Sequence, residues 1–112
     1  MTKKMTIKEV ALLMGIIPEN HNYLTLLELE DAKVQMVFTE EENRKFDIKS
    51  EQAPDGRYYL TFNEESSDGY LKSIKFKPRA ISAISEVLKK MDEEKELDQR
   101  FISIYKKFAI GG

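Results

Sequence analysis

RKFDIKSEQAPDGRYYLTFNEESSDGYLKSIKFK, residues 44–77, is the stretch that decides the predicted fold. It contains three runs of β-type composition, separated by two turns that each end in Asp-Gly. Asp-Gly between two such runs is a strong local hairpin signal, because glycine supplies the positive φ that a tight loop needs. We therefore predict a three-stranded antiparallel meander with loops at 54–56 and 67–69.

The two loops predict a consistent register for this meander. The first pairs Ala53 with Arg57, and the second pairs Ser66 with Tyr70. Extended along the strands, both pairings place apolar side chains on one shared face: Ile48, Leu60, Phe62, Ile74 and Phe76. The opposite face collects mostly polar side chains, as a half-buried antiparallel sheet requires.

The first half of the chain is predicted to add one helix and two strands. Thr6 and Glu9 fit a capping box before a short helix at 7–14, and residues 1–5 precede it as a loose tail. Composition predicts strands at 23–29 and 33–39, because apolar residues alternate with polar ones in the second of these runs.

After Pro78 the sequence carries two amphipathic stripes. The first consists of Ile81, Ile84, Leu88 and Met91, and the second of Leu97, Phe101, Ile104, Tyr105 and Phe108. At helical spacing the second stripe is rotated by roughly 120° from the first. Either the helix breaks within 92–96 and its second half folds back on the sheet, or one long helix presents the second stripe to a partner.

The predicted architecture is therefore a single α+β domain over residues 1–112. It consists of a five-stranded antiparallel sheet that includes the meander at 44–77, a short N-terminal helix and a long or broken C-terminal helix. At this length one core can form without disulfides, and the chain contains no cysteine. No apolar run approaches the roughly 20 residues that span a bilayer, so we expect a cytoplasmic protein without a membrane segment.

Charge is distributed unevenly along the sequence, although the net charge is only −2. Residues 28–68 carry twelve acids and five bases, whereas residues 69–91 carry six bases and one acid. Such polarity bears on the choice of partners, because it steers oppositely charged surfaces together.

Catalytic and metal chemistry finds little support in the sequence. His21 is the only histidine, and one imidazole without cysteine is a weak basis for a transition-metal site. The acidic run at 40–42 lacks the alternating ligands and glycine of a calcium loop. No glycine-rich phosphate loop is present. We therefore expect no enzyme, no metal site and no small-molecule cofactor.

Nucleic-acid binding is the alternative that the polar face of the meander suggests. Single strands are bound by aromatic rings within a basic groove, and this face carries Lys49, Lys75 and Lys77 around Tyr59. In the order of its elements, residues 44–91 resemble the single-stranded-DNA-binding domain of transcriptional coactivators. That resemblance implies the same kind of ligand for these four residues.

The N-terminal segment from Thr6 to Ile16 resembles the first helix and turn of MerR- or excisionase-type helix-turn-helix domains. The resemblance implies that a recognition helix with basic or amide side chains comes next. Residues 18–28 are instead acidic and apolar, without Arg or Lys. The residues that would read a groove are thus absent, and this hypothesis ranks below the basic sheet face.

The favoured hypothesis is a protein-binding or regulatory module. Its expected contact surface is the second C-terminal stripe, Leu97, Phe101, Ile104, Tyr105 and Phe108, together with the acidic surface. The partner would be another protein or a second copy of the chain. A third hypothesis, based on composition, is an acidic decoy that uses Glu40, Glu41 and Glu42 to occupy the basic site of a nucleic-acid enzyme.

Overall fold

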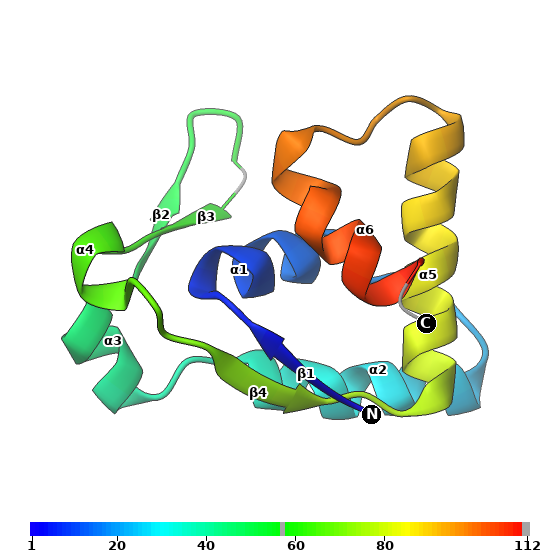
Figure 1. Cartoon of the computed structure of the whole chain (residues 1–112), viewed down its shortest axis with the longest axis horizontal. Coiled ribbons are helices and arrows are strands. Elements are labelled where there is room, and N and C mark those ends of the chain that lie inside the picture. The colour runs from blue at the N-terminus through cyan, green and yellow to red at the C-terminus, as the bar shows by residue number, and fades with distance from the viewer. Residues whose placement is uncertain (57, 111–112) are drawn as a thin grey trace.

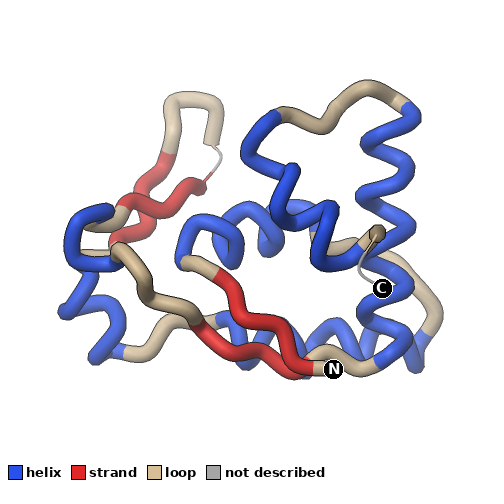
Figure 2. Tube along the Cα trace, in the orientation of Figure 1, coloured by secondary structure: helices blue, strands red, loops and turns tan. Residues whose placement is uncertain are grey.

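The structure is a computed structural model that describes residues 1–56 and 58–110. In this part of the chain, the structure combines helices with two separate two-stranded antiparallel sheets, one of which projects at the edge of the molecule (Figures 1 and 2). The helices are α1 (Ile7–Ile16), α2 (Tyr23–Met36), α3 (Glu40–Phe46), α4 (Glu64–Ser67), α5 (Pro78–Glu93) and α6 (Ile102–Phe108), with a 3₁₀ turn at Gln99–Phe101. The strands are β1 (Thr2–Met5), β2 (Lys49–Gln52), β3 (Tyr58–Thr61) and β4 (Lys72–Lys75).

The predicted five-stranded sheet is wrong, although the α+β class is confirmed. Within the described residues, β1 pairs only with β4 and β2 only with β3, both antiparallel. Where the structure describes it, the first hairpin has the predicted register, with Ser50 opposite Leu60. The predicted pair of Ala53 with Arg57 lies outside the described residues. Gly56 has the expected positive φ of 88°. The first Asp-Gly turn therefore specified the β2–β3 hairpin, but it did not specify how this hairpin is placed in a larger sheet.

The second predicted hairpin fails because Asn63 starts a helix. Its side chain accepts a hydrogen bond from the Ser66 N–H, so residues 64–67 form α4. Gly69 still has a positive φ of 79°, but it leads the chain away from β3. Consequently β4 pairs with β1, and Thr2–Met5 form a strand within the expected loose tail at 1–5.

The strands predicted at 23–29 and 33–39 are also wrong, because α2 runs through Tyr23–Met36 and so covers the first predicted strand and half of the second. Asn22 accepts from the Thr25 N–H at the start of α2. Thr39 and Glu42 form a capping box at the start of α3. The predicted capping box at Thr6 is present, but α1 runs past Gly15 to Ile16.

The C-terminal helix is broken, which agrees with the first of the two predicted arrangements, a break within 92–96. Helix α5 ends at Glu93, and Lys95 adopts a positive φ of 59° in the connection. Helix α6 then folds back across the molecule, towards α1 and α5 (Figure 1). Its Phe108 packs edge-on against Phe76, with ring centroids 5.0 Å apart.

The main core lies between β1–β4 and the helices α1, α2, α5 and α6. Each of these elements contributes fully or nearly fully buried side chains, among them Met5, Leu13, Leu29, Ile74, Phe76, Leu88 and Ile104. A smaller core of Ile7, Phe46 and Ile48 joins α1 to α3 and the β2–β3 hairpin. The hairpin thus lies at the edge of the molecule and away from the main core.

Both edges of the β1–β4 pair are covered by side chains. On the β4 side, the Gln35 amide of α2 exchanges hydrogen bonds with the backbone of Lys75. On the β1 side, the Lys107 ammonium of α6 donates to the Lys4 carbonyl at 2.8 Å. These contacts occupy edge positions with which further strands could otherwise pair. The outward face of the pair is open to solvent, since Thr2, Lys4, Ser73 and Lys75 are exposed.

Candidate functional site

The predicted C-terminal contact stripe lies in the core. Phe101, Ile104 and Phe108 are buried, and Leu97 and Tyr105 pack against them as partly buried residues. Burying these side chains requires only the break after Glu93, which lets α6 reach α1 and α5. The five residues therefore stabilise the monomer and do not form an exposed surface in the folded chain.

The four residues of the predicted nucleic-acid site are divided between two sheets. Lys49 and Tyr59 lie on the β2–β3 hairpin, whereas Lys75 lies on β4 and Lys77 precedes α5. Lys49 lies 3.5 Å from the Asp47 carboxylate. The Tyr59 hydroxyl donates to Glu51, which raises the pKa of Tyr59. The hairpin half of the site is thus interspersed with acids, and the predicted single basic face does not exist.

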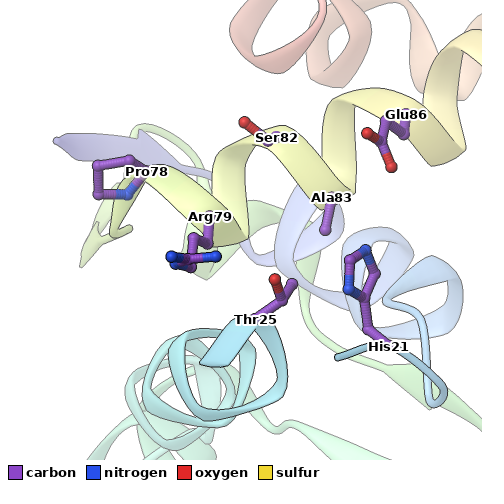
Figure 3. A pocket seen from close by; sticks show the side chains of 7 residues that line it. All are labelled: His21, Thr25, Pro78, Arg79, Ser82, Ala83 and Glu86. Atoms are coloured by element: carbon purple, nitrogen blue, oxygen red, sulfur yellow. The ribbon is translucent and has the colours of Figure 1, made fainter. Parts of the chain in front are cut away.

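A surface pocket of about 270 Å³ lies between α5 and the start of α2 (Figure 3). Its lining residues are His21, Thr25, Pro78, Arg79, Ser82, Ala83 and Glu86. The Glu28 carboxylate accepts from the Arg79 N–H at 2.9 Å and lies 3.6 Å from the Arg79 side chain. The N-terminus of α5, which would attract an anion, is therefore already occupied by this carboxylate.

The pocket does not assemble a catalytic group. His21 Nδ1 accepts a hydrogen bond from the Asn22 N–H at 2.9 Å. Figure 3 shows Ser82 pointing away from His21, so a nucleophile–base pair, which needs hydrogen-bond reach, is not formed. No group of three His, Cys, Asp or Glu side chains that could hold a metal ion occurs among the described residues.

Two buried carboxylates serve as structural links. Glu42 of α3 accepts from Lys72 at 2.8 Å and from the Tyr70 hydroxyl. Burial would raise the pKa of Glu42, but these hydrogen bonds outweigh it and lower the pKa to about 2, while the same contact raises that of Tyr70 to about 12. The link ties α3 to the start of β4.

The second carboxylate, Glu9 of α1, connects the two ends of the chain. Burial would raise its pKa, but the 2.7 Å hydrogen bond from Lys107 and that from the Thr6 N–H leave it lowered. The nearby Ser103 side chain also lowers the pKa of Glu9. The second carboxylate oxygen, Glu9 Oε2, is buried and has no partner at normal hydrogen-bond geometry among the described residues. Glu9 and Lys107 thus hold α6 against α1.

The acidic run at 40–42 divides its side chains between surface and interior. Glu42 points inward, whereas Glu40 and Glu41 are exposed in the first turn of α3. Acids in this position stabilise a helix by favourable interaction with its dipole. The run therefore offers two exposed carboxylates rather than the three that the decoy hypothesis uses.

Helix α2 has apolar side chains on two opposite faces. One stripe, Thr25, Leu29, Ala32 and Met36, is buried in the core. The other is exposed: Tyr23 (73%), Leu24 (52%), Leu27 (45%) and Val34 (69%). We define the outward face of α2 as these four residues with the exposed acids Glu30 and Asp31. It is the largest run of exposed apolar side chains on any one described element.

The outward face was missed in the sequence although its signal is present. Residues 25, 29, 32 and 36 are spaced i, i+4, i+7 and i+11, and residues 23, 27, 30 and 34 repeat the same spacing two positions earlier. A shift of two residues turns the helix by about 200°. Two offset stripes cancel the amphipathic asymmetry on which helix prediction depends.

Comparison with known proteins returned no match: no family model, no curated protein and no solved structure resembles the chain significantly. Among the described residues, no helix combines the length and apolar character needed to cross a membrane. Function is therefore inferred from the surfaces of this chain alone.

Proposed function

We propose that the protein is a non-enzymatic protein-binding module and that the outward face of α2 is its contact surface. The single observation that carries this proposal is the second apolar stripe of α2, which the fold leaves uncovered. Clustered exposed apolar side chains with a polar border are typical of interaction sites, whereas isolated ones are common on any surface. The cysteine-free chain suits a reducing compartment, and we place this function in the cytoplasm.

The partner that fits this face is an amphipathic helix with lysine or arginine beside its apolar stripe. Helices dock through side chains at i, i+4, i+7 and i+11, which is the spacing of residues 23, 27, 30 and 34. Glu30 lies within the stripe and Asp31 at its border, both exposed. A basic partner would pair with these carboxylates, and an acidic one would be repelled.

A second copy of the chain fits the face less well. In a two-fold antiparallel pairing of α2 helices, residues near the middle of each helix meet at the axis. Glu30 is next to the midpoint of the 14-residue helix. The two Glu30 carboxylates would therefore approach each other, and like charges at such distances are destabilising.

The expected affinity is modest. Each aliphatic side chain contributes roughly 1.5–3 kcal/mol when it passes from full exposure to full burial, and those of α2 are already partly covered. Association costs an estimated 4–15 kcal/mol in lost freedom. A helix of 14 residues is only about 21 Å long, so it presents less area than the ~800 Å² per partner of a stable complex. Reversible binding suits a regulatory contact.

The test uses a designed peptide of about 18 residues with leucine on one helical face and lysine beside it, long enough to match α2. We expect that titration into ¹⁵N-labelled protein shifts amide signals along α2. Leu27→Glu should weaken binding by about tenfold or more, equivalent to 1.4 kcal/mol. The control Ile102→Glu places the same charge at another exposed apolar residue (53%) and should leave binding unchanged.

Several outcomes would overturn the proposal. Equal weakening by Leu27→Glu and Ile102→Glu would mean that the loss does not depend on the outward face of α2, because an added carboxylate should by itself attract a lysine-containing peptide. Shifts that map outside α2 would place the contact elsewhere. A peptide with glutamate in place of lysine should bind more weakly, and equal affinity for both peptides would remove the basic partner from the proposal.

A further inference from the structure

The β1–β4 pair has an outward face of lysine and hydroxyl side chains. Thr2 lies opposite Lys75, and Lys4 lies opposite Ser73, so each cross-strand pair places one hydroxyl beside one ammonium group. Lys77 continues this face, because the chain stays extended past buried Phe76 (Lys77 φ −81°, ψ 159°). We define the basic sheet face as the exposed residues Thr2, Lys4, Ser73, Lys75 and Lys77.

The three lysines of this face are not neutralised by the protein. Among the described residues, Lys4, Lys75 and Lys77 form no ion pair, whereas Lys72 and Lys107 are engaged with buried carboxylates. Asp31 borders the face, since it accepts from the same Gln35 Nε2 that donates to the Lys75 carbonyl. Lysines that neighbour one another on a sheet repel, and a bound anion would relieve that repulsion.

The face is also held rigidly. Behind it, Ile74 and Phe76 alternate with Ser73, Lys75 and Lys77 and are buried in the main core. Met1 and Phe76 exchange backbone hydrogen bonds of 2.8 Å in both directions, which extends the ladder beyond β1 and β4. Gln35 and Lys107 cover the two edges. The lysine stems therefore start from fixed positions on an open surface, and Figure 1 shows β4 passing in front of α2.

We propose that the basic sheet face binds the phosphate backbone of a nucleic-acid duplex. Lysine ammonium groups and Ser or Thr hydroxyls are typical donors to phosphate oxygens, and such contacts position a protein without reading sequence. The face has no aromatic residue, so it lacks the stacking platform of single-strand binders. It also has no large apolar side chain to insert into a lipid surface, as a peripheral membrane site would.

The basic sheet face replaces the composite site predicted from the sequence. Lys75 and Lys77 remain, but Lys4 takes the place of Lys49, and Tyr59 has no part because it lies on the other sheet. The pairing of β4 with a strand some 70 residues earlier in the chain brings Lys4 into the face. Apart from Asp31, which borders both surfaces, the proposal rests on other residues than the outward face of α2, and either surface can fail its test without the other.

The salt dependence of binding follows from the number of lysines. Each phosphate neutralised on duplex DNA contributes about −0.9 to the slope of log K against log salt, so three lysines predict a slope of about −2.7. The affinity should lie in the range of non-specific binding, roughly 10⁻⁴ to 10⁻⁶ M. A contact that neutralises only one phosphate would give a slope of about −0.9.

The test is fluorescence anisotropy with a labelled mixed-sequence duplex of about 20 base pairs, titrated at about 50 and 200 mM salt. The double substitution Lys75→Gln with Lys77→Gln should lower the affinity at least tenfold at low salt and reduce the slope by about 1.8. The matched control, Lys89→Gln with Lys90→Gln, removes the same charge from exposed positions on α5 and should change the affinity by less than about threefold. Asp31→Asn should tighten binding.

The proposal is overturned if the wild-type protein fails to bind at low salt, or if both double variants lose affinity equally. It is also overturned if a single strand of the same length binds more tightly than the duplex, since that requires base contacts that this face does not provide. The last part of the test measures binding of the protein to vesicles that contain phosphatidylserine. Binding to vesicles but not to duplex, with the same dependence on Lys75 and Lys77, would identify a membrane site instead.

Discussion

The side-chain amide of Gln35 and the backbone of Lys75 exchange two hydrogen bonds. Gln35 Oε1 accepts from the Lys75 N–H at 2.8 Å, and Gln35 Nε2 donates to the Lys75 carbonyl at 2.9 Å. A residue of helix α2 thus occupies the edge of β4 that another strand would otherwise pair with. The same contact fixes the outward face of α2 next to the basic sheet face.

Gln35→Ala should lower the free energy of unfolding by about 1 kcal/mol, because two exposed hydrogen bonds are lost and water replaces them only in part. Urea denaturation measures this change. Gln35→Glu retains an acceptor for the Lys75 N–H but loses the donor, and should lie between alanine and wild type. If both variants are as stable as the wild type, the contact does not hold α2 against β4.

Stability should fall in acid because of Glu42. Its pKa is about 2 in the folded chain, whereas a glutamate in an unfolded chain has its ordinary pKa of 4.5, so the unfolded state binds its proton first as the pH falls. The stabilisation from Glu42 is therefore complete above about pH 4.5 and is lost between pH 4.5 and 2. Thermal denaturation across this range measures the loss.

Glu42→Gln provides the control for that pH dependence. At neutral pH it should destabilise by roughly 2–3 kcal/mol, because Lys72 keeps a largely buried charge without its partner. The variant should also show a shallower loss of stability in acid than the wild type. A variant with an unchanged acid profile would mean that Glu42 does not control it.

Lys107→Met should loosen the contact between α6 and α1. The substitution removes the donor to the Glu9 carboxylate and to the Lys4 carbonyl, and it leaves a buried carboxylate without its cation. We expect a loss of roughly 2–4 kcal/mol and faster hydrogen exchange in α6. The double variant with Glu9→Gln should recover part of the loss, and no recovery would show that the pair is not coupled.

Alanine substitutions at the neighbouring residues Phe101 and Ile102 test whether the C-terminal stripe is buried in the core. Phe101 is buried, whereas its neighbour Ile102 is exposed. Phe101→Ala should cost about 3–5 kcal/mol, and Ile102→Ala about 0.5 kcal/mol or less. Equal costs in chemical denaturation would mean that α6 does not pack as described.

The hairpin at residues 49–61 could be predicted because its information is local. Pro54-Asp55-Gly56 requires one loop geometry, and that geometry fixes the pairing of Ser50 with Leu60. The same reasoning failed at Ser67-Asp68-Gly69, since Asn63 caps a helix just before this turn. The Asp-Gly turn predicts that the chain bends, but it does not specify which strands pair on either side of the bend. Here the helix capped by Asn63 separates β3 from the turn.

The pairing of β4 with β1 and the helical state of α2 were not accessible in this way. Strand β1 lies some 70 residues before β4, so no local pattern links them. In α2, Val34 and Met36 alternate with polar neighbours like a strand, yet the first is exposed and the second is buried across a helix. The cap at Asn22 was the overlooked signal for α2, and the capping box at Thr39 was that for α3. The basic sheet face therefore depends on a non-local strand pairing, whereas the outward face of α2 depends on a local cap.

Leu27→Glu tests most directly whether the second apolar stripe of α2 serves binding and not folding, because it gives two readouts on one protein. We predict an unfolding free energy within about 0.5 kcal/mol of wild type, as for exposed positions generally, together with at least a tenfold loss of affinity for the lysine-flanked amphipathic peptide. Large destabilisation, or retained affinity in a stable variant, would contradict this role for α2.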